Sequence, residues 1–113
     1  MPSPVPALRI TVLREGDDVA VVRLAGELDI ATGPLLKQRL QQLTTGSAEP
    51  QVRRLVLDLS ELAFTDVVGL GVLLHAEREL ADRGGQVRLR HPAPLVRRVV
   101  RLLDLDTRLL VEP

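Results

Sequence analysis

Two aspartates, Asp58 and Asp66, stand near each other in the sequence, one at the end of an apolar run and one before a second apolar stretch. Two carboxylates can share the roles of general acid and general base. Asp58, however, is expected at a strand end, where an aspartate satisfies nearby backbone donors. The sequence also lacks a glycine-rich phosphate loop, a nucleophile elbow and a histidine beside a serine and an acid. We therefore expect a protein that is not an enzyme.

The other residue types that carry chemistry are scarce. His75 and His91 are the only histidines, they lie far apart in the sequence, and there is no cysteine. A metal site needs several converging histidine, cysteine or acidic ligands, and thiol chemistry needs cysteine. We expect no metal, no cofactor and no disulfide bond.

The composition narrows the class of partner. Fifteen basic residues balance fifteen acidic ones, and Phe64 is the single aromatic residue. A protein without net charge or aromatic stacking platforms is poorly suited to bind nucleic acid. The apolar runs are far shorter than the roughly 20 residues that cross a bilayer, so direct membrane insertion is not expected. These exclusions leave recognition of another protein as the favoured kind of function.

The first seven residues differ from the rest. Residues 1–7 hold three prolines and no basic stretch followed by an apolar segment. Proline removes backbone donors, so this segment is expected to be a disordered tail, and it does not have the pattern of a signal peptide. We expect a cytoplasmic protein with one domain over residues 8–113.

Apolar periodicity predicts the elements that position these residues. The expected strands cover residues 8–12, 19–25, 55–59, 87–89 and 109–111, and the expected helices cover residues 34–43, 67–83 and 95–102. Residues 44–51 and 60–65 are expected to be connections. A short turn joins the first two strands and predicts an antiparallel hairpin. The order β-β-α-β-α-β-α-β predicts an α/β domain with a mixed, mostly parallel sheet and helices packed against it.

The first two helices have recognisable starts. Thr32 can cap the first helix, and Asp66 can cap the second. Gly69 and Gly71 each cost about 1 kcal/mol inside a helix relative to alanine, which indicates a close approach to the sheet or to a partner. Val67 and Val68 follow Asp66, and at least one of them is expected to be exposed, as in a protein interface.

The last helix is expected to bury one apolar face. Leu95, Val99 and Leu102 recur at helical spacing and are the expected buried residues. The opposite side is basic and is expected to be solvated, with Arg97, Arg98 and Arg101.

Three stretches together carry a resemblance to a known family. They are Gly26–Asp29 followed by a helix, Leu55–Ser60, and Phe64–Leu74 with its Asp-Val-Val-Gly-Leu-Gly sequence. Their order resembles that of the STAS domain of bacterial anti-sigma factor antagonists, and the similarity extends from about Leu8 to Val111. The resemblance implies a single STAS domain.

The family implies a function in transcription regulation. Its members bind an anti-sigma factor, often of the ATP-binding kinase fold, and thereby release a sigma factor. In many members the partner phosphorylates a serine at the start of the second helix. A phosphate there adds about two negative charges in the middle of the docking surface and ends binding.

The sequence departs from the family at that serine. The family pattern is Asp-Ser-Ser-Gly or Asp-Ser-Thr-Gly, whereas this sequence has Asp66-Val67-Val68-Gly69. Val67 has no hydroxyl and cannot be phosphorylated. Three hypotheses follow: constitutive binding of an anti-sigma factor, a STAS scaffold subunit in a transport or multi-STAS signalling complex, or a phosphorylation switch moved to Thr65.

The resemblance also implies a set of partner-binding residues. They lie on the loop after the second strand and at the start of the second helix: Glu27, Asp29, Thr32, Thr65, Asp66, Val67, Val68 and Gly69. A small-nucleotide sensor is a further alternative, supported only by the basic last helix. Homodimerisation is left open.

Overall fold

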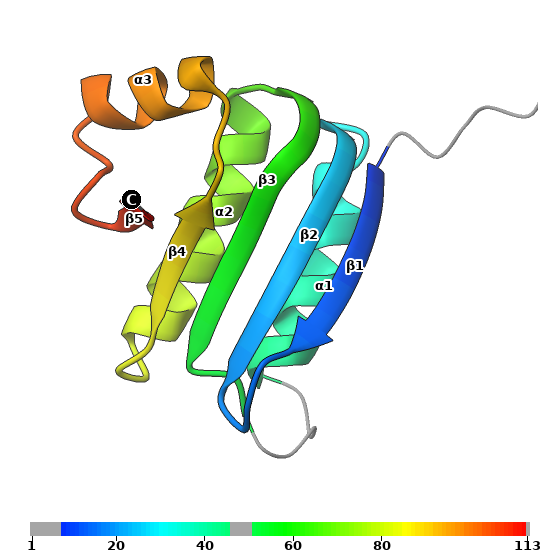
Figure 1. The fold of residues 1–113 in the computed structure, drawn as a ribbon, viewed down its shortest axis with the longest axis vertical. Coiled ribbons are helices and arrows are strands. Elements are labelled where there is room, and N and C mark those ends of the chain that lie inside the picture. Colours follow the sequence, from blue (N-terminus) through cyan, green and yellow to red (C-terminus); the bar gives the residue numbers. More distant parts are fainter. Residues whose placement is uncertain (1–7, 46–50, 113) are drawn as a thin grey trace, which may run out of the picture.

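A computed structural model describes residues 8–45 and 51–112 (Figure 1). The expected tail at residues 1–7 and most of the expected connection at residues 44–51 lie outside the described residues. The elements follow the predicted order. They are β1 (Leu8–Arg14), β2 (Val19–Leu28), α1 (Gly33–Thr45), β3 (Arg54–Thr65), α2 (Val67–Ala81), β4 (Gln86–Arg90), α3 (Pro94–Leu102) and β5 (Leu109–Val111).

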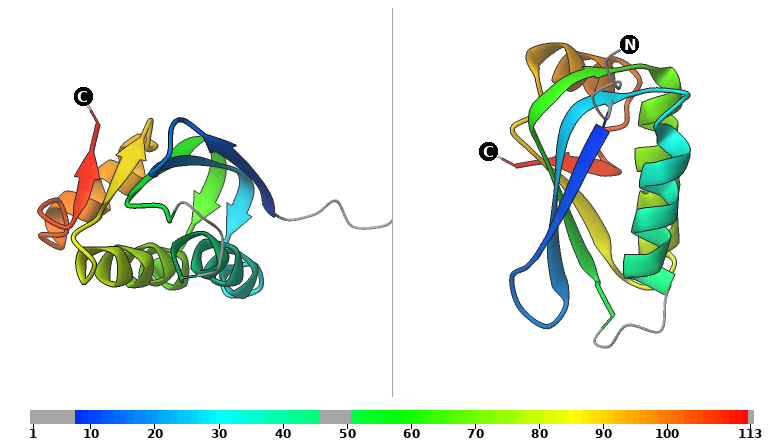
Figure 2. Two further views of the ribbon diagram at one scale, coloured as in Figure 1. Left: turned by 90° about the horizontal axis from the view of Figure 1, so that it is seen from below. Right: turned by 90° about the vertical axis from the view of Figure 1, so that its right-hand side faces the viewer.

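The five strands form one sheet in the order β1-β2-β3-β4-β5. β1 and β2 are antiparallel, as the predicted hairpin requires, and the other neighbours are parallel. Helices α1 and α2 lie side by side on one face of the sheet (Figure 2). α3 lies across the end of the sheet, beyond the carboxyl end of β4 (Figure 1). The predicted α/β fold with a mixed, mostly parallel sheet is confirmed.

The core lies between the sheet and the α1–α2 layer. In β3, Leu55, Leu57 and Leu59 point towards the helices and are at most 1% exposed. They meet leucines of both helices, among them Leu36 and Leu73. A core of leucine and valine is expected for a chain with one aromatic residue, because these side chains fill space without polar groups that need partners. No described helix has the length and apolarity that a membrane crossing requires.

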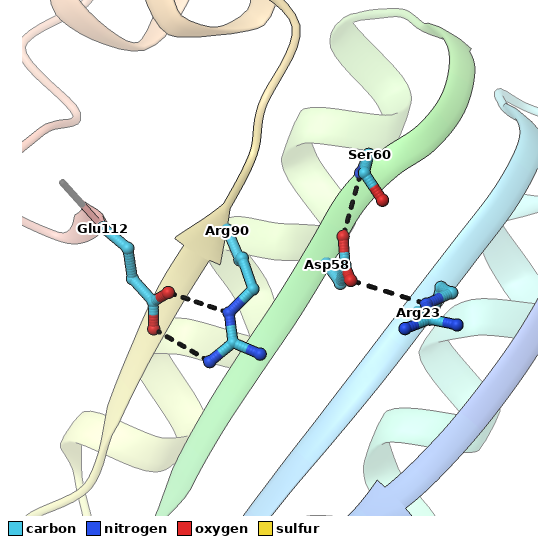
Figure 3. Close-up of polar contacts among 5 residues, drawn as sticks. All are labelled: Arg23, Asp58, Ser60, Arg90 and Glu112. Carbon is cyan, nitrogen blue, oxygen red and sulfur yellow. Dashed lines mark hydrogen bonds and ion pairs between the residues drawn. The ribbon is translucent and has the colours of Figure 1, made fainter.

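The opposite face of the sheet, which α1 and α2 do not cover, carries a row of charges (Figure 3). Asp58 pairs in register with Arg23 on β2 and with Arg90 on β4. Its carboxylate lies 3.4 Å from Arg23 Nε and accepts a hydrogen bond from the Ser60 amide at 3.0 Å. Arg90 in turn donates to Glu112 through Nε at 2.8 Å. The row therefore joins β2 to β3 through Arg23 and Asp58, and β4 to the residue after β5 through Arg90 and Glu112.

These contacts change the acidity of Asp58. Burial raises its pKa, but the hydrogen bonds from the backbone and hydroxyl of Ser60, together with Arg23, lower it by more. The pKa of Asp58 therefore lies below the ordinary value of an aspartate. Asp58 also lies within β3 rather than at a strand end as expected, although it does satisfy the backbone donor of Ser60.

β1 to β4 are all longer than predicted, and the difference is largest in β2 and β3. Residues 60–65 were expected to be a connection, but β3 continues through them to Thr65. β2 continues to Leu28, so Glu27 belongs to a strand. Pairing between the two strands extends to Leu28 and Thr65 through register shifts, with Gly26 at a positive φ of 109°. Irregular pairing of this kind breaks the alternation of apolar and polar residues by which a strand is recognised in sequence.

The helices differ from the predictions in smaller ways. α1 includes Thr44, which was expected in the following connection, and its hydroxyl donates to the carbonyl of Leu40 at 2.9 Å. α2 ends at Ala81 rather than Arg83. The Gly85 amide donates to Leu80 O at 2.8 Å, and Gly84 has a positive φ of 77°. Glycine adopts this conformation easily, so the two glycines do end the helix.

The predicted buried face of α3 is wrong. Leu95 and Leu102 are each 70% exposed, and Val99 is half-buried. The buried residues are Val96 and Val100, at 8% and 1% exposure. α3 has apolar residues on two adjoining faces, and its position at the end of the sheet decides which one is covered.

Candidate functional site

The start of α2 is a capped helix terminus, as predicted. Asp66 has extended backbone angles, and its Oδ1 accepts a hydrogen bond from the Gly69 amide at 2.9 Å. The Asp66 carbonyl accepts from the Leu70 amide at 3.0 Å. One backbone donor of the first turn is thereby satisfied by the aspartate, which also places a negative charge at the positive end of the helix dipole. The geometry of Val67 and Val68 is fixed by this cap.

Gly69 lets α2 approach the end of β2. A β-carbon at this position would lie 2.5 Å from Thr65 Oγ1 and 2.8 Å from Leu28 O. The Asp66 amide also donates to Leu28 O, at 3.4 Å. Gly71 differs, because a β-carbon there would have no neighbour within 4 Å. Close packing therefore explains Gly69 but not Gly71.

The loop between β2 and α1 is held by its own polar residues. Asp29 Oδ1 accepts from the amides of Ala31 and Thr32 at 2.9 and 3.1 Å. The Thr32 hydroxyl donates to Glu27 O at 2.8 Å and accepts from the Asp29 amide at 3.0 Å. Thr32 precedes α1 as predicted, but its hydroxyl stabilises the loop rather than capping a helix amide. Thr32 is 4% exposed, whereas Glu27 is exposed.

Apolar side chains gather at the starts of α1 and α2. Val67 is 80% exposed and Val68 44%, so the predicted exposure at this helix start is confirmed. Ile30 and Leu35, which flank the start of α1, are 74% and 57% exposed. The two helix starts are neighbours, since a β-carbon at Gly33 would lie 3.9 Å from a methyl carbon of Val68. We call Ile30, Leu35, Val67 and Val68 the apolar end face.

An apolar groove adjoins this face. It has a volume of about 250 Å³ and lies between the end of β3, the start of α2 and the start of α3. Among the described residues that line it, Asp66 is the only ionisable one, and its carboxylate accepts a hydrogen bond from the Gly69 amide. The main apolar contributors are Leu59, Leu62, Val67, Leu70, Leu95 and Val99. The groove can receive an apolar side chain of a partner.

The predicted site residues thus fall into two groups. Thr32, Asp29 and Gly69 hold the loop and the helix start in place, whereas Val67 and Val68 present surface. Thr65 is half-buried, and its hydroxyl donates to Asp66 O at 3.4 Å. The contribution of α3 to the groove was not predicted. Leu95 and Val99 were instead predicted to lie in the core of the domain.

The arrangement resembles a binding surface more than a reaction centre. Asp58 and Asp66 are used separately, in the uncovered face of the sheet and in the cap of α2. His75 pairs with Glu79 at 2.9 Å along the outside of α2. Within residues 8–45 and 51–112, histidines and acidic residues form no group that could hold a metal ion.

Comparisons with known proteins agree with this fold. The sequence matches the family model described as "Mlab, STAS domain" over residues 11–112. It is 33% identical over 88 residues to an anti-sigma F factor antagonist of Paenibacillus polymyxa, covering 78% of this chain and 70% of that protein.

Two solved structures of anti-sigma factor antagonists are similar to this one. Unphosphorylated SpoIIAA superposes with a TM-score of 0.72 at 26% identity, over 83% of each chain. An antagonist from Mycobacterium paratuberculosis superposes with a TM-score of 0.74 at 32% identity, over 93% of this chain and 86% of that chain. By sequence match, sheet topology and helix arrangement, this chain belongs to the STAS domain family.

Proposed function

We propose that this protein is an anti-sigma factor antagonist that binds its anti-sigma factor through the apolar end face and thereby releases a sigma factor. The observation that carries the proposal is Val67, an apolar side chain 80% exposed at a capped helix start. The apolar end face has three further exposed apolar side chains, and relatives at 33% and 28% identity are anti-sigma factor antagonists. The protein acts by binding rather than by catalysis, in the cytoplasm where sigma factors work.

Burial of this face would supply much of the binding energy. Covering an exposed valine or isoleucine side chain is worth about 1.5–3 kcal/mol. A few such side chains at the centre of an interface usually dominate its affinity. Val67 and Ile30, with the largest exposed fractions on the face, are the expected anchors.

The proposed antagonist has no phosphorylation switch at the start of α2. Val67 occupies the position that the resemblance gives to the phosphorylated serine, and valine has no oxygen to phosphorylate. The partner, proposed to have the ATP-binding kinase fold, would therefore stay bound in the presence of ATP. Thr65 is a poor substitute, since its hydroxyl is half-buried and already donates to Asp66 O.

Calorimetric titration with the purified anti-sigma factors of the same genome tests the proposal. Val67→Asp should lower the affinity at least about tenfold, because a charge must then be desolvated in the interface. Leu13→Asp is the matched control, since Leu13 is 47% exposed on β1, away from the helix starts. If Val67→Asp binds like the wild type, the end face is not the interface. If no anti-sigma factor binds, the function is wrong.

A scaffold role is the second candidate. It is favoured by the matching family model, which is the Mlab one. A STAS subunit of a transport or signalling assembly could dock through the same apolar end face. Affinity purification from the source cells separates the two functions: transporter subunits or other STAS proteins would support the scaffold, and an anti-sigma factor would support the antagonist. Titration with ATP and GTP tests the nucleotide-sensing alternative.

A further inference from the structure

We propose that α3 receives an amphipathic helix of the partner whose apolar stripe packs on Leu95, Val99 and Leu102 and whose flanking residues are acidic. The inference rests on the proposed function, in which the partner docks on the apolar end face. It adds a second part of the interface and states its chemistry.

The first observation is the stripe itself. Leu95, Val99 and Leu102 are spaced as i, i+4 and i+7, so they lie along one side of α3. The domain covers this side only in part: Val99 is half-buried against the core, whereas the fully buried residues of α3 are Val96 and Val100. Leu95 and Leu102 are instead 70% exposed. An ordered apolar stripe left in water is typical of a surface that another helix covers.

The second observation is continuity with the face already described. Leu95 and Val99 line the apolar groove on one side, and Val67 and Leu70 line it on the other. A helix lying on the α3 stripe would therefore place a side chain in the groove next to Val67. The stripe, the groove and the apolar end face then form one surface across the starts of α2 and α3.

The third observation is charge. α3 carries Arg97, Arg98 and Arg101 and no acidic residue. Among the described residues, none of these three arginines forms an ion pair, whereas Arg23, Arg90 and Arg108 each pair with a carboxylate. On a helical projection Arg98 lies directly beside the stripe, on the side away from Val96, and Arg101 lies one step further round the same side. Acidic residues flanking the partner's apolar stripe would complement Arg98 first and Arg101 next.

Charge and shape also decide between occupants. A second copy of this chain, packed stripe to stripe, would bring two sets of arginines together, and like charges oppose that contact. An anionic membrane would match the arginines and leucines, but it has no side chain to fill the groove beside Val67. A protein helix with an acidic flank satisfies the stripe, the groove and the charge together.

The test uses the anti-sigma factor that binds the wild-type chain and compares three new variants, together with Val67→Asp, by calorimetry. Leu95→Ser/Leu102→Ser should weaken binding about tenfold or more, as expected for an interface anchor. Arg98→Glu/Arg101→Glu should weaken it by a similar factor and remove most of its salt dependence. Arg88→Glu, a charge reversal of an exposed residue of β4, should have little effect. All the altered side chains are exposed, so circular dichroism should confirm unchanged folding.

The outcomes separate the inference from the proposed function. If both α3 variants bind like the wild type while Val67→Asp does not, the inference is overturned and the function stands. If Val67→Asp and the α3 variants all bind normally, neither the apolar end face nor α3 is the interface, and the inference is overturned. If no anti-sigma factor binds, the proposed function and the inference are both overturned. Sedimentation with phosphatidylglycerol vesicles and analytical ultracentrifugation test the other occupants. Binding to the vesicles, or self-association, that is lost in the α3 variants would also overturn the inference.

Discussion

A β-carbon added to Gly69 would lie 2.8 Å from Leu28 Cγ, closer than two carbon atoms can approach without displacement. The first turn of α2 is therefore seated directly on the end of β2. The same contact brings Asp66 against the Leu28 carbonyl and orients Val67 and Val68 outwards. The surface proposed for docking therefore rests on a close contact between α2 and the end of β2.

Gly69→Ala should lower the free energy of unfolding by about 1–3 kcal/mol, because the added methyl overpacks a buried contact. Gly71→Ala is the matched control in the same helix, where the added methyl meets open space. It should be neutral or stabilise the protein by up to about 1 kcal/mol. Urea denaturation of both variants measures the difference. Equal effects would contradict the close approach at Gly69.

Gly71→Ala has a second use, because Gly71 is exposed one turn after Val67. If a partner helix passes close to α2 at this point, the variant should bind more weakly although it is no less stable. Titration of the same anti-sigma factor with wild type and variant measures this. Unchanged affinity would place the interface nearer the start of the helix.

Asp66→Ala should cost about 1 kcal/mol of stability, since the Gly69 amide loses its acceptor. Asp66→Asn should keep most of that stability, because an asparagine side chain caps nearly as well. The pair separates the cap from the charge. If Asp66→Asn is stable but binds the partner poorly, the carboxylate itself contributes to docking. Should Asp66→Ala unfold no more easily than the wild type, the cap has no measurable energetic role.

Asp58 should contribute to acid stability. Its pKa is lowered in the folded state, so the folded state holds its proton less tightly than the unfolded chain does. The resulting stability is fully present above the unfolded pKa, near pH 4, and is lost as the pH falls through the lower folded pKa. Asp58→Asn should therefore flatten the loss of stability below about pH 4. Denaturation curves at several acidic pH values check this, and a slope identical to that of the wild type would count against it.

Val67→Ser should create a phosphoacceptor at the start of α2. We expect the unphosphorylated variant to bind its anti-sigma factor and the phosphorylated one to be released, because the phosphate adds about two charges to an apolar surface. Incubation with the partner and ATP, followed by mass spectrometry, measures modification. The wild-type chain is the control and should stay unmodified. A phosphate on wild-type Thr65 would instead show that the switch has moved there.

Glu77→Gln should loosen the segment that follows α3. Arg108 donates to Glu77 Oε2 through Nε at 3.0 Å and Nη2 at 2.7 Å, which ties this segment to α2. Hydrogen bonds between charged groups are worth about 1.5–3 kcal/mol, so a loss of this order is expected. Amide hydrogen exchange should accelerate in residues 103–112 and remain unchanged in β1. If the substitution changed the exchange rate equally in residues 103–112 and in β1, the Glu77–Arg108 ion pair would not be what holds this segment.

Much of this protein could be predicted from local patterns. The order of elements, the capped start of α2 at Asp66 and the exposure of Val67 and Val68 depend on neighbours in the sequence, because alternation, helical spacing and capping act over a few residues. The composition likewise predicted a leucine and valine core. That residue 67 is a valine, which has no hydroxyl, is a property of the sequence alone.

Long-range packing decided the rest. β2 extends to Leu28 and β3 extends to Thr65 because the two strands pair with each other over these residues. The sequence of either segment alone does not show that the other strand lies beside it. The sequence of α3 has two adjoining apolar faces. The position of the helix at the end of the sheet determines that Val96 and Val100 are the covered residues. The stripe of Leu95, Val99 and Leu102 has the same local pattern as a core face. It became a candidate docking surface because Leu95 and Leu102 at its two ends stay exposed in the described fold, which depends on distances in space rather than on spacing in sequence.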